Sequence, residues 1–253
     1  MLCEGERLDI VNENLKLIQK KDGLTYGTDA YLLSAYAPAF PRGRAVELGC
    51  GTGIVSLLCG VRGQFARVDA IEVQPAFAEL AARNAVLNGL EEKVFVHCRD
   101  LRDLRAADIG GEVDVVLANP PYMRADSGKL NRTDAKTIAR HEICGGIDDF
   151  CGAAARLVRW GGHFVCVWRP DRLIDLIAAM RAHGLEPKRM TAVHADASAE
   201  ASMVLVAARR GGSPSLTLTR PLLLYRDPPS VTPRKLTDWA ARIYAEGRFF
   251  DGR

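Results

Sequence analysis

The sequence predicts an α/β fold in which a mostly parallel sheet carries helices on both faces. Between about residues 43 and 209, short apolar segments rich in Val, Ile and Phe alternate with segments whose apolar residues recur at helical spacing. A glycine-rich turn follows the first apolar segment directly. Near residues 187–209, two strand-like segments follow each other without an intervening helix, which predicts an antiparallel hairpin at one sheet edge.

The elements of the core follow in a regular order. Buried strands are expected at Ala45–Leu48, Arg67–Val73, Val94–His97, Val113–Ala118 and His163–Trp168. Helices are expected at Ile54–Gly60, Pro75–Asn88, Asp148–Trp160 and about 170–183. The edge hairpin would consist of Pro187–His194 and Ala201–Arg209. These elements define a core domain over residues 43–210.

Shorter extensions flank this core. Residues 1–42 are expected to hold a strand at Leu15–Gln19 and a helix at Asp29–Pro38, capped by Thr28 or Asp29, and to pack over the ligand site of the core. Residues 211–253 are expected to hold a strand-like Leu216–Tyr225 and a helix over about 233–246, and to pack on the core.

Composition indicates a soluble globular protein. Of 253 residues, 48% are hydrophobic and 26% charged, and no apolar run approaches the roughly 20 residues that span a bilayer. The N-terminus lacks the pattern of a signal peptide, so a cytoplasmic location is expected. The seven cysteines are scattered and form no Cys-x-x-Cys pair, so neither a disulfide framework nor a metal site is expected.

The net charge of +3 is unevenly distributed. From Arg209 to the end, nine Lys and Arg residues face four acids, whereas the rest of the chain carries a small negative charge. A basic tail on a near-neutral body fits either a polyanionic partner or an ordinary solvated surface.

A glycine loop marks the candidate ligand site. Glu47-Leu48-Gly49-Cys50-Gly51-Thr52-Gly53 follows the first core strand and opens a helix. Glycines at such a turn let a ligand approach the backbone closely. A dinucleotide loop would require a third glycine where Ile54 stands, and no Lys follows to make a P-loop. Glu47 would repel a pyrophosphate but suits a ligand that carries an ammonium and a sulfonium.

Two further acids follow the next two strands. Glu72 ends the second strand, where a carboxylate can accept hydrogen bonds from both ribose hydroxyls. Asp100 follows the third strand and could accept a hydrogen bond from an adenine amino group. Either acid alone would be an ordinary surface or capping carboxylate, but their order after successive strands predicts a site for a nucleoside joined to an amino acid.

Residues 43–209 therefore resemble the class I S-adenosylmethionine-dependent methyltransferases. The resemblance implies a seven-stranded, mostly parallel, doubly wound sheet that ends in an antiparallel pair, and S-adenosyl-L-methionine as the cofactor. It also implies that residues at these places contact the methionine moiety, the ribose and the adenine. The implied cofactor-binding residues in these elements are Glu47, Gly49, Cys50, Gly51, Gly53, Glu72 and Asp100.

Asn119-Pro120-Pro121-Tyr122 follows the fourth strand and indicates the reaction. The amide oxygen of Asn119 and the carbonyl of Pro120 can accept both hydrogens of a planar –NH2 group, which frees its delocalised lone pair to attack a methyl group. Tyr122 offers a ring on which a base can stack. The element resembles that of amino-methyltransferases acting on adenine N6, guanine N2 or a glutamine amide. In these enzymes Asn119 would also adjoin the cofactor, and no metal is required.

Three further segments bear on the choice of amine. The chain resembles the bacterial methyltransferases that modify N6 of adenine 37 in valine tRNA in Gly27–Leu33, in Ala139–Glu142, and in Pro221–Tyr225 followed by Val231–Pro233. The resemblance implies that Thr28, with Asp29, lies near the cofactor, although a helix cap is an equal alternative. Arg140 and His141 could line the substrate mouth.

The expected function is methylation of N6 of an adenine in RNA, with tRNA as the expected RNA. A glutamine amide, rRNA guanine N2, a module that binds the cofactor without catalysis and a nucleotide-dependent oxidoreductase remain as alternatives. An adenine in an anticodon loop is already single-stranded and is cheaper to splay out than one in a duplex. The basic tail and the Arg and Lys residues of the loop at residues 124–140 would then contact phosphates, with binding that weakens steeply in salt. No membrane or protein partner is indicated.

Overall fold

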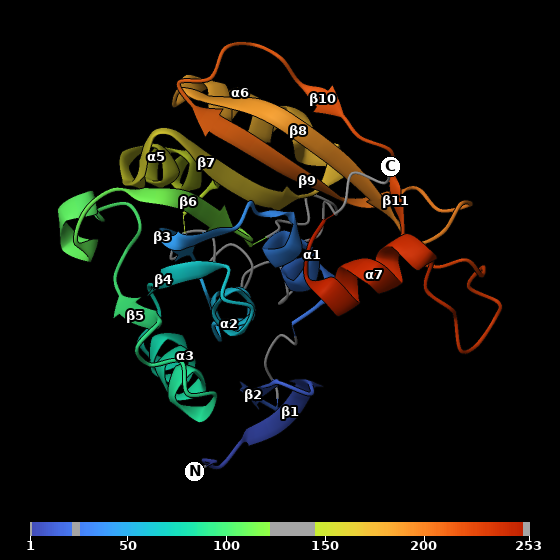
Figure 1. Cartoon of the computed structure of the whole chain (residues 1–253), viewed down its shortest axis with the longest axis horizontal. Helices are drawn as coiled ribbons and strands as arrows, with labels where there is room; N and C mark the ends of the chain where they lie inside the picture. The colour runs from blue at the N-terminus through green and yellow to red at the C-terminus, as the bar shows by residue number, and fades with distance from the viewer. Residues whose placement is uncertain (1, 22–25, 122–144, 250–253) are drawn as a thin grey trace, which may run out of the picture.

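The computed structural model describes residues 2–21, 26–121 and 145–249 (Figure 1). Within these residues the centre is a nine-stranded sheet, ordered β10-β8-β9-β7-β6-β3-β4-β5, with β11 also paired to β8. The pairs among β3, β4, β5, β6 and β7 are parallel, and β9 runs antiparallel to both β7 and β8. The strands are β3 (Phe40–Leu48), β4 (Phe65–Glu72), β5 (Val94–Cys98), β6 (Val113–Ala118), β7 (Val158–Trp168), β8 (Leu185–His194), β9 (Ala201–Arg210), β10 (Thr217–Leu218) and β11 (Leu222–Leu223).

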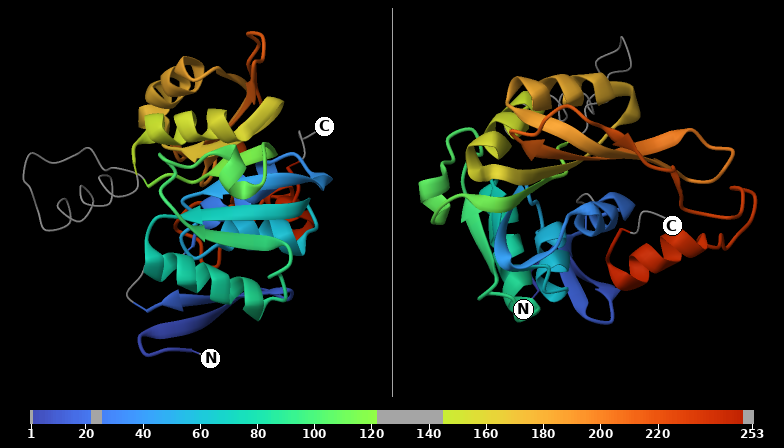
Figure 2. Two further views of the ribbon diagram at one scale, coloured as in Figure 1. Left: turned by 90° about the vertical axis from the view of Figure 1, so that its left-hand side faces the viewer. Right: turned by 45° about the horizontal axis from the view of Figure 1, so that its top comes forward.

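Helices cover both faces of this sheet (Figure 2). One apolar cluster joins the sheet to α1, α2, α3 and α7, and a second joins it to α5, α6 and the short helix η1. Successive residues of β3 alternate between the clusters, Ala45 in the first and Val46 in the second, as buried parallel strands require. No helix of the described part is long and apolar enough to cross a membrane. The helices are α1 (Thr28–Tyr36), α2 (Ile54–Val61), α3 (Pro75–Leu87), η1 (Ala106–Ile109), α5 (Ile147–Leu157), η2 (Pro170–Arg172), α6 (Leu173–Ala182) and α7 (Asp238–Glu246).

The doubly wound α/β fold predicted from the sequence is confirmed, and β3 to β9 form its seven-stranded sheet. The antiparallel hairpin of β8 and β9 is also present, but β8 is not the outermost strand. The predicted strand Leu216–Tyr225 lies beside β8 as two short parallel strands, β10 and β11. The segment between them contains Pro221, which has no N–H to donate to a ladder.

The predicted helix Asp148–Trp160 was wrong at its end. The helix stops at Leu157, and Trp160 belongs to β7. Val158, directly after the helix, already pairs with Val113 of β6, so pairing in the sheet ends the helical pattern. The last helix was also predicted to start too early. Helix α7 starts at Asp238, and the Thr237 side chain before it accepts a hydrogen bond from Ala240 N.

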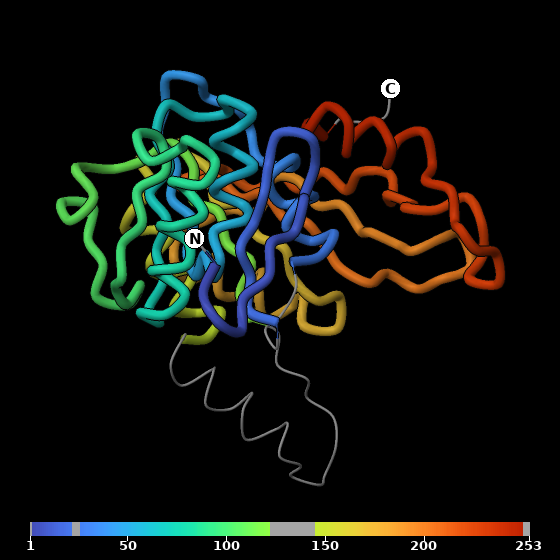
Figure 3. Tube along the Cα trace, turned by 90° about the horizontal axis from the view of Figure 1, so that it is seen from below, coloured from blue at the N-terminus to red at the C-terminus, as the bar shows by residue number. Residues whose placement is uncertain are grey.

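The N-terminal segment forms a hairpin of β1 (Glu6–Asn12) and β2 (Leu15–Lys20), of which only β2 was predicted. The hairpin lies beside α3 (Figure 3). Two asparagine side chains, one in α3 and one directly after it, hydrogen-bond to the backbone of β2 as a neighbouring strand would. Asn84 accepts from Ile18 N at 2.7 Å and donates to Ile18 O at 3.0 Å, and Asn88 makes the same pair of bonds with Lys16 at 2.9 and 2.8 Å.

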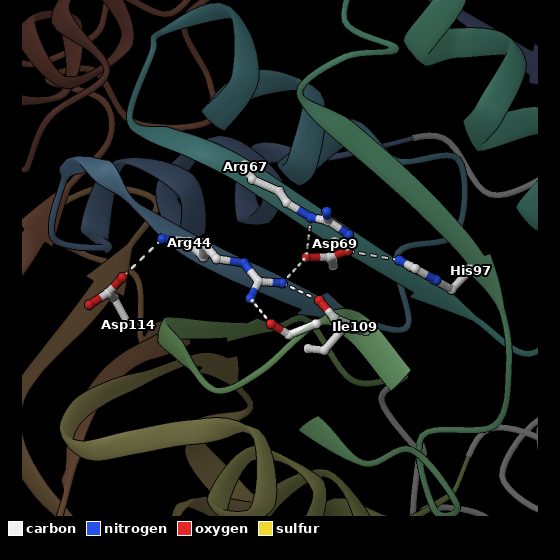
Figure 4. A network of polar contacts seen from close by, with 7 residues as sticks. Arg44, Arg67, Asp69, His97, Ile109 and Asp114 are labelled. Carbon is white, nitrogen blue, oxygen red and sulfur yellow. Dashed lines mark hydrogen bonds and ion pairs between the residues drawn. The ribbon is translucent and has the colours of Figure 1, made fainter. Parts of the chain in front are cut away.

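A polar network covers part of the sheet face near η1 (Figure 4). The buried carboxylate of Asp69 accepts hydrogen bonds from Arg67 at 2.6 Å and Arg44 at 3.2 Å, and His97 Nε2 lies 2.8 Å from it. Arg44 also donates to the carbonyl oxygens of Ile109 and Gly110, at the end of η1. Burial alone would raise the pKa of Asp69, but these hydrogen bonds outweigh it and lower the pKa. The network thus anchors η1 to the sheet.

Candidate active site

The predicted glycine loop turns sharply between β3 and α2. Gly49, Gly51 and Gly53 have φ angles of 68°, 55° and 86°, in the left-handed region that side chains disfavour. Cys50 N donates to Ile71 O at 2.9 Å, which ties the loop to β4. A Cβ on Gly51 would meet no atom within 4 Å, so the backbone there borders open space. The loop can therefore admit a ligand against its main chain.

Glu47 is buried at the end of β3 with 2% of its surface exposed. Its Oε2 accepts hydrogen bonds from Ser56 N at 2.8 Å and from the Ser56 hydroxyl, in the first turn of α2. Burial raises the pKa of Glu47 to about 7, Ser56 opposes this shift, and the negative charge of Glu72 adds to it. Glu47 thus joins the strand to the helix, a structural role that the sequence did not reveal.

Glu72 ends β4 and is also buried. Its Oε2 accepts from Gly51 N at 2.9 Å, and its Oε1 accepts from Gln74 N at 2.9 Å. The carboxylate therefore bridges the glycine loop and the turn before α3. A small pocket opens beside it between the ends of β3, β4 and β5, lined by Gly49, Ile71, Glu72, Val73, Arg99, Asp100 and Leu101.

Asp100 lies at the rim of this pocket, bound to Arg102. Its Oδ1 accepts from Arg102 N at 2.8 Å, and its Oδ2 accepts from Arg102 Nε at 2.9 Å. The hydrogen bonds from the Arg102 side chain lower the pKa of Asp100, so the carboxylate is ionised near neutral pH. Contact of Asp100 with an adenine amino group remains a prediction.

The carboxylates of Glu72 and Asp100 and the open backbone of the glycine loop suit S-adenosylmethionine. Glu72 can accept from ribose hydroxyls, and the apolar floor of Ile71 and Leu101 suits an adenine face. The turn, with Gly49 exposed and open space beside Gly51, leaves room for the methionine moiety over the loop. The assignments of Glu47 and Cys50 as cofactor contacts remain predictions, since both side chains are buried.

Asn119 follows β6 at the same edge of the sheet, because β6 pairs in parallel with β3. Its Nδ2 donates to Asp29 Oδ2 at 2.8 Å. Pro120 is buried directly after it. The remaining predicted substrate residues Tyr122, Arg140 and His141, and the loop at residues 124–138, lie outside the described residues.

The element around Thr28 does not cap α1 as predicted. Gly27 occupies the N-cap position without a side-chain hydrogen bond, and the helix begins at Thr28. Contact of Thr28 with the cofactor stays a prediction.

Asn84 is a residue of the site that sequence reasoning missed. It is fully buried, and its Nδ2 donates to Thr52 O at 3.0 Å as well as to β2. One side chain thus connects the glycine loop to the N-terminal hairpin. The pair Asn84 and Asn88, one helical turn apart at the end of α3, was the available signal.

Within the described residues, four of the nine basic residues of the tail are paired with acids. Arg234 pairs with Asp196 and Arg226 with Asp238, within the tail or against the core. The remaining pairs of this kind are Arg242 with Glu246 and Arg210 with Glu112. The positive charge counted along the sequence therefore overstates the charge available to a partner.

A larger cavity of about 820 Å³ lies near the other end of α1 from Asp29. Arg62, Lys188, Arg189 and Arg248 are among its lining residues. Arg189 lies 3.9 Å from the centre of the Tyr36 ring. The cavity is thus separate from the sheet edge that carries Asn119.

The sheet order and the acids at its strand ends define a class I methyltransferase that uses S-adenosylmethionine. The sequence model of the family described as "Methyltransferase small domain" matches residues 19–143. A crystal structure of a predicted O-methyltransferase from Agrobacterium tumefaciens has a TM-score of 0.70 and 23% identity over 88% of this chain and 98% of that one, a likeness of fold alone.

Two curated relatives specify the family. A tRNA1(Val) (adenine(37)-N6)-methyltransferase from Aeromonas hydrophila is 33% identical over 73% of this chain and 76% of the relative. One from Porphyromonas gingivalis is 30% identical over 66% of this chain and 67% of the relative. The chain belongs to the family of the tRNA1(Val) (adenine(37)-N6)-methyltransferases.

Proposed function

We propose that this enzyme methylates N6 of an adenine in tRNA, at position 37, as the names of its relatives state for them. The observation that carries the proposal is the placement of Asn119. It follows β6 at the sheet edge that also holds the glycine loop and Glu72, and its amide nitrogen is bonded to Asp29. A planar amine could thus meet an amide oxygen beside the methyl donor.

The residues after β6 would make the amine reactive. Asn119 Oδ1 and the Pro120 carbonyl accept its two N–H bonds, so that the nitrogen lone pair turns toward the methyl group. S-adenosylmethionine, when bound, supplies a methyl carbon on a positively charged sulfur. As the N–C bond forms, the C–S bond breaks with its electrons going to sulfur, and one N–H proton passes to water.

Recognition of the RNA would combine shape and charge. A single-stranded loop offers an unpaired base that can enter the site at low cost. Because several tail arginines are paired with acids, we expect fewer phosphate contacts than the nine basic residues suggest. Binding should still weaken with salt, and an affinity for tRNA that does not change with salt would contradict this part.

The test is a competition among substrate classes. The purified protein is incubated with labelled S-adenosylmethionine and, separately, with tRNA, rRNA and total protein from a strain that lacks this enzyme. We expect label in N6-methyladenosine of the tRNA fraction. Label in rRNA guanine or in protein glutamine would replace the proposed substrate while leaving the methyltransferase chemistry intact.

A further inference from the structure

We propose that Asp29 is a positioning residue for methyl transfer, which acts by holding the Asn119 amide in the orientation that the reaction needs. The inference rests on the proposed function, since it assigns a role to the same site. It concerns the geometry of Asn119 and not the affinity for the cofactor or the RNA.

The contact itself fixes which atom of the amide points where. Asp29 Oδ2 accepts from Asn119 Nδ2 at 2.8 Å. An ionised carboxylate has acceptors only, so the nitrogen corner of the amide must face it. The flipped amide would bring two oxygens together. Asn119 Oδ1 is therefore held pointing away from Asp29, and it is the oxygen that must accept from the substrate amine.

The Asp29 carboxylate is itself restrained. Its second oxygen, Oδ1, accepts from the Ala30 backbone N at 2.9 Å, in the first turn of α1. A Cβ at position 27 would lie only 2.8 Å from that same oxygen. Gly27 thus provides the space in which the carboxylate lies, although its own φ of −119° is open to any residue.

Helix α1, which carries Asp29, contacts helix α7 near the C-terminal end of the chain. The ring of Tyr31, on the same helix, lies 5.2 Å from the ring of Tyr244 on α7. Gly27 thus leaves the space that the Asp29 carboxylate occupies, and Asp29 is bonded to Asn119. This accounts for a segment whose chemistry the sequence alone left undecided.

Three variants separate a positioning role of Asp29 from a role in folding or in cofactor binding. Asp29→Ala removes the acceptor, whereas Asp29→Asn keeps an oxygen that can accept from Asn119 but removes the charge. Asp175→Ala is the matched control, because it removes an acid from the first turn of another helix, α6. Unfolding temperatures, cofactor affinity by calorimetry and single-turnover rates on tRNA are measured for each.

We expect Asp29→Ala to slow single-turnover transfer about 10- to 100-fold, as loss of a supporting hydrogen bond does elsewhere, with affinities for cofactor and tRNA within about 2-fold. Asp29→Asn should recover much of this loss, and Asp175→Ala should match the wild type. In an Asn119→Ala background, Asp29→Ala should add no further loss. A rate within 2-fold of wild type, an additive double variant, or a loss of cofactor affinity in Asp29→Asn would overturn the proposal.

A second readout does not depend on the substrate. The side-chain amide signal of Asn119, identified by its absence in Asn119→Ala, is followed by ¹⁵N NMR in the protein without RNA. Asp29→Ala should shift that signal, and Asp175→Ala should not. If the wild type fails to methylate tRNA while the signal shifts, the proposed substrate is wrong and the Asp29 contact stands. An unmoved signal refutes the contact whatever the substrate.

Discussion

Replacing Glu47 with Gln should change how the stability of the enzyme depends on pH. Glu47 is buried, and burial raises its pKa from the usual 4.5 to about 7. Between these values the folded state holds a proton that the unfolded state has released. The neutral carboxyl therefore contributes stability that is fully present below pH 4.5 and is lost as the pH rises through 7.

The size of the effect follows from that shift. One pKa unit corresponds to about 1.4 kcal/mol, so the shift from 4.5 to about 7 amounts to about 3 kcal/mol. Gln cannot ionise, yet its side-chain oxygen can still accept from Ser56. The free energy of unfolding of Glu47→Gln, relative to that of the wild type, should thus rise by about 3 kcal/mol between pH 4.5 and pH 8.

Urea unfolding followed by circular dichroism at several pH values measures this difference. Subtracting the two proteins at each pH removes the contribution of every other titrating group. A difference that stays constant from pH 4.5 to 8, or that falls, would refute the reasoning that Glu47 is neutral in its buried setting.

Three further changes test the supports of the site. Asn84→Leu should lower the free energy of unfolding by about 2–3 kcal/mol, because buried backbone groups of Ile18 lose their partners, as urea titration would show; an unchanged stability would mean that the hairpin does not depend on it. Asp69→Asn should lower the free energy of unfolding by about 2–4 kcal/mol at pH 7, because it removes the buried charge that pairs with Arg67 and Arg44. Since the pKa of Asp69 is lowered, its contribution is present above pH 3.8 and fades below it, so the two proteins should converge in acid; a constant gap would contradict this. Gly51→Ala and Gly89→Ala should each lower the free energy of unfolding by about 1 kcal/mol, since both glycines have a positive φ and open space around them. Only Gly51→Ala should weaken cofactor binding in calorimetry. An equal effect of both variants on binding would be inconsistent with a cofactor loop.

Local patterns predicted most of the core. The parallel strands are continuous apolar segments with burial on both faces, so β3 to β7 could be placed within a few residues from the sequence. The glycine loop was likewise predictable, because its three alternating glycines adopt positive φ angles that other residue types disfavour.

Features that depend on distant partners were not predictable. Trp160 continues a helical pattern, but the chain pairs with β6 from Val158 onward, and this pairing with a distant segment places Trp160 in a strand. The strand β1 alternates too weakly in hydrophobicity to stand out, with Leu8 and Ile10 both exposed. Its pairing depends on β2.

The same limit applies within the site. Asp29 and Asn119 are separated by 90 positions, and nothing near either one indicates that they meet. Glu47 was predicted as a partner for a cationic ligand, but its bonds with Ser56 depend on the path of the intervening loop. Sequence patterns thus located the elements of the site, and three-dimensional contacts showed how its side chains support one another.

The central claim is that Asn119 directs methylation to N6 of adenine 37. Its most direct test is mass spectrometry of nucleosides from an unmodified valine tRNA transcript, treated with the enzyme and S-adenosylmethionine, beside a transcript with guanine at that position. We predict one N6-methyladenosine per molecule in the first, none in the second, and only slow residual formation with Asn119→Ala, whose cofactor affinity should be retained. N6-methyladenosine formed equally in the guanine transcript, or by Asn119→Ala at the wild-type rate, would contradict it.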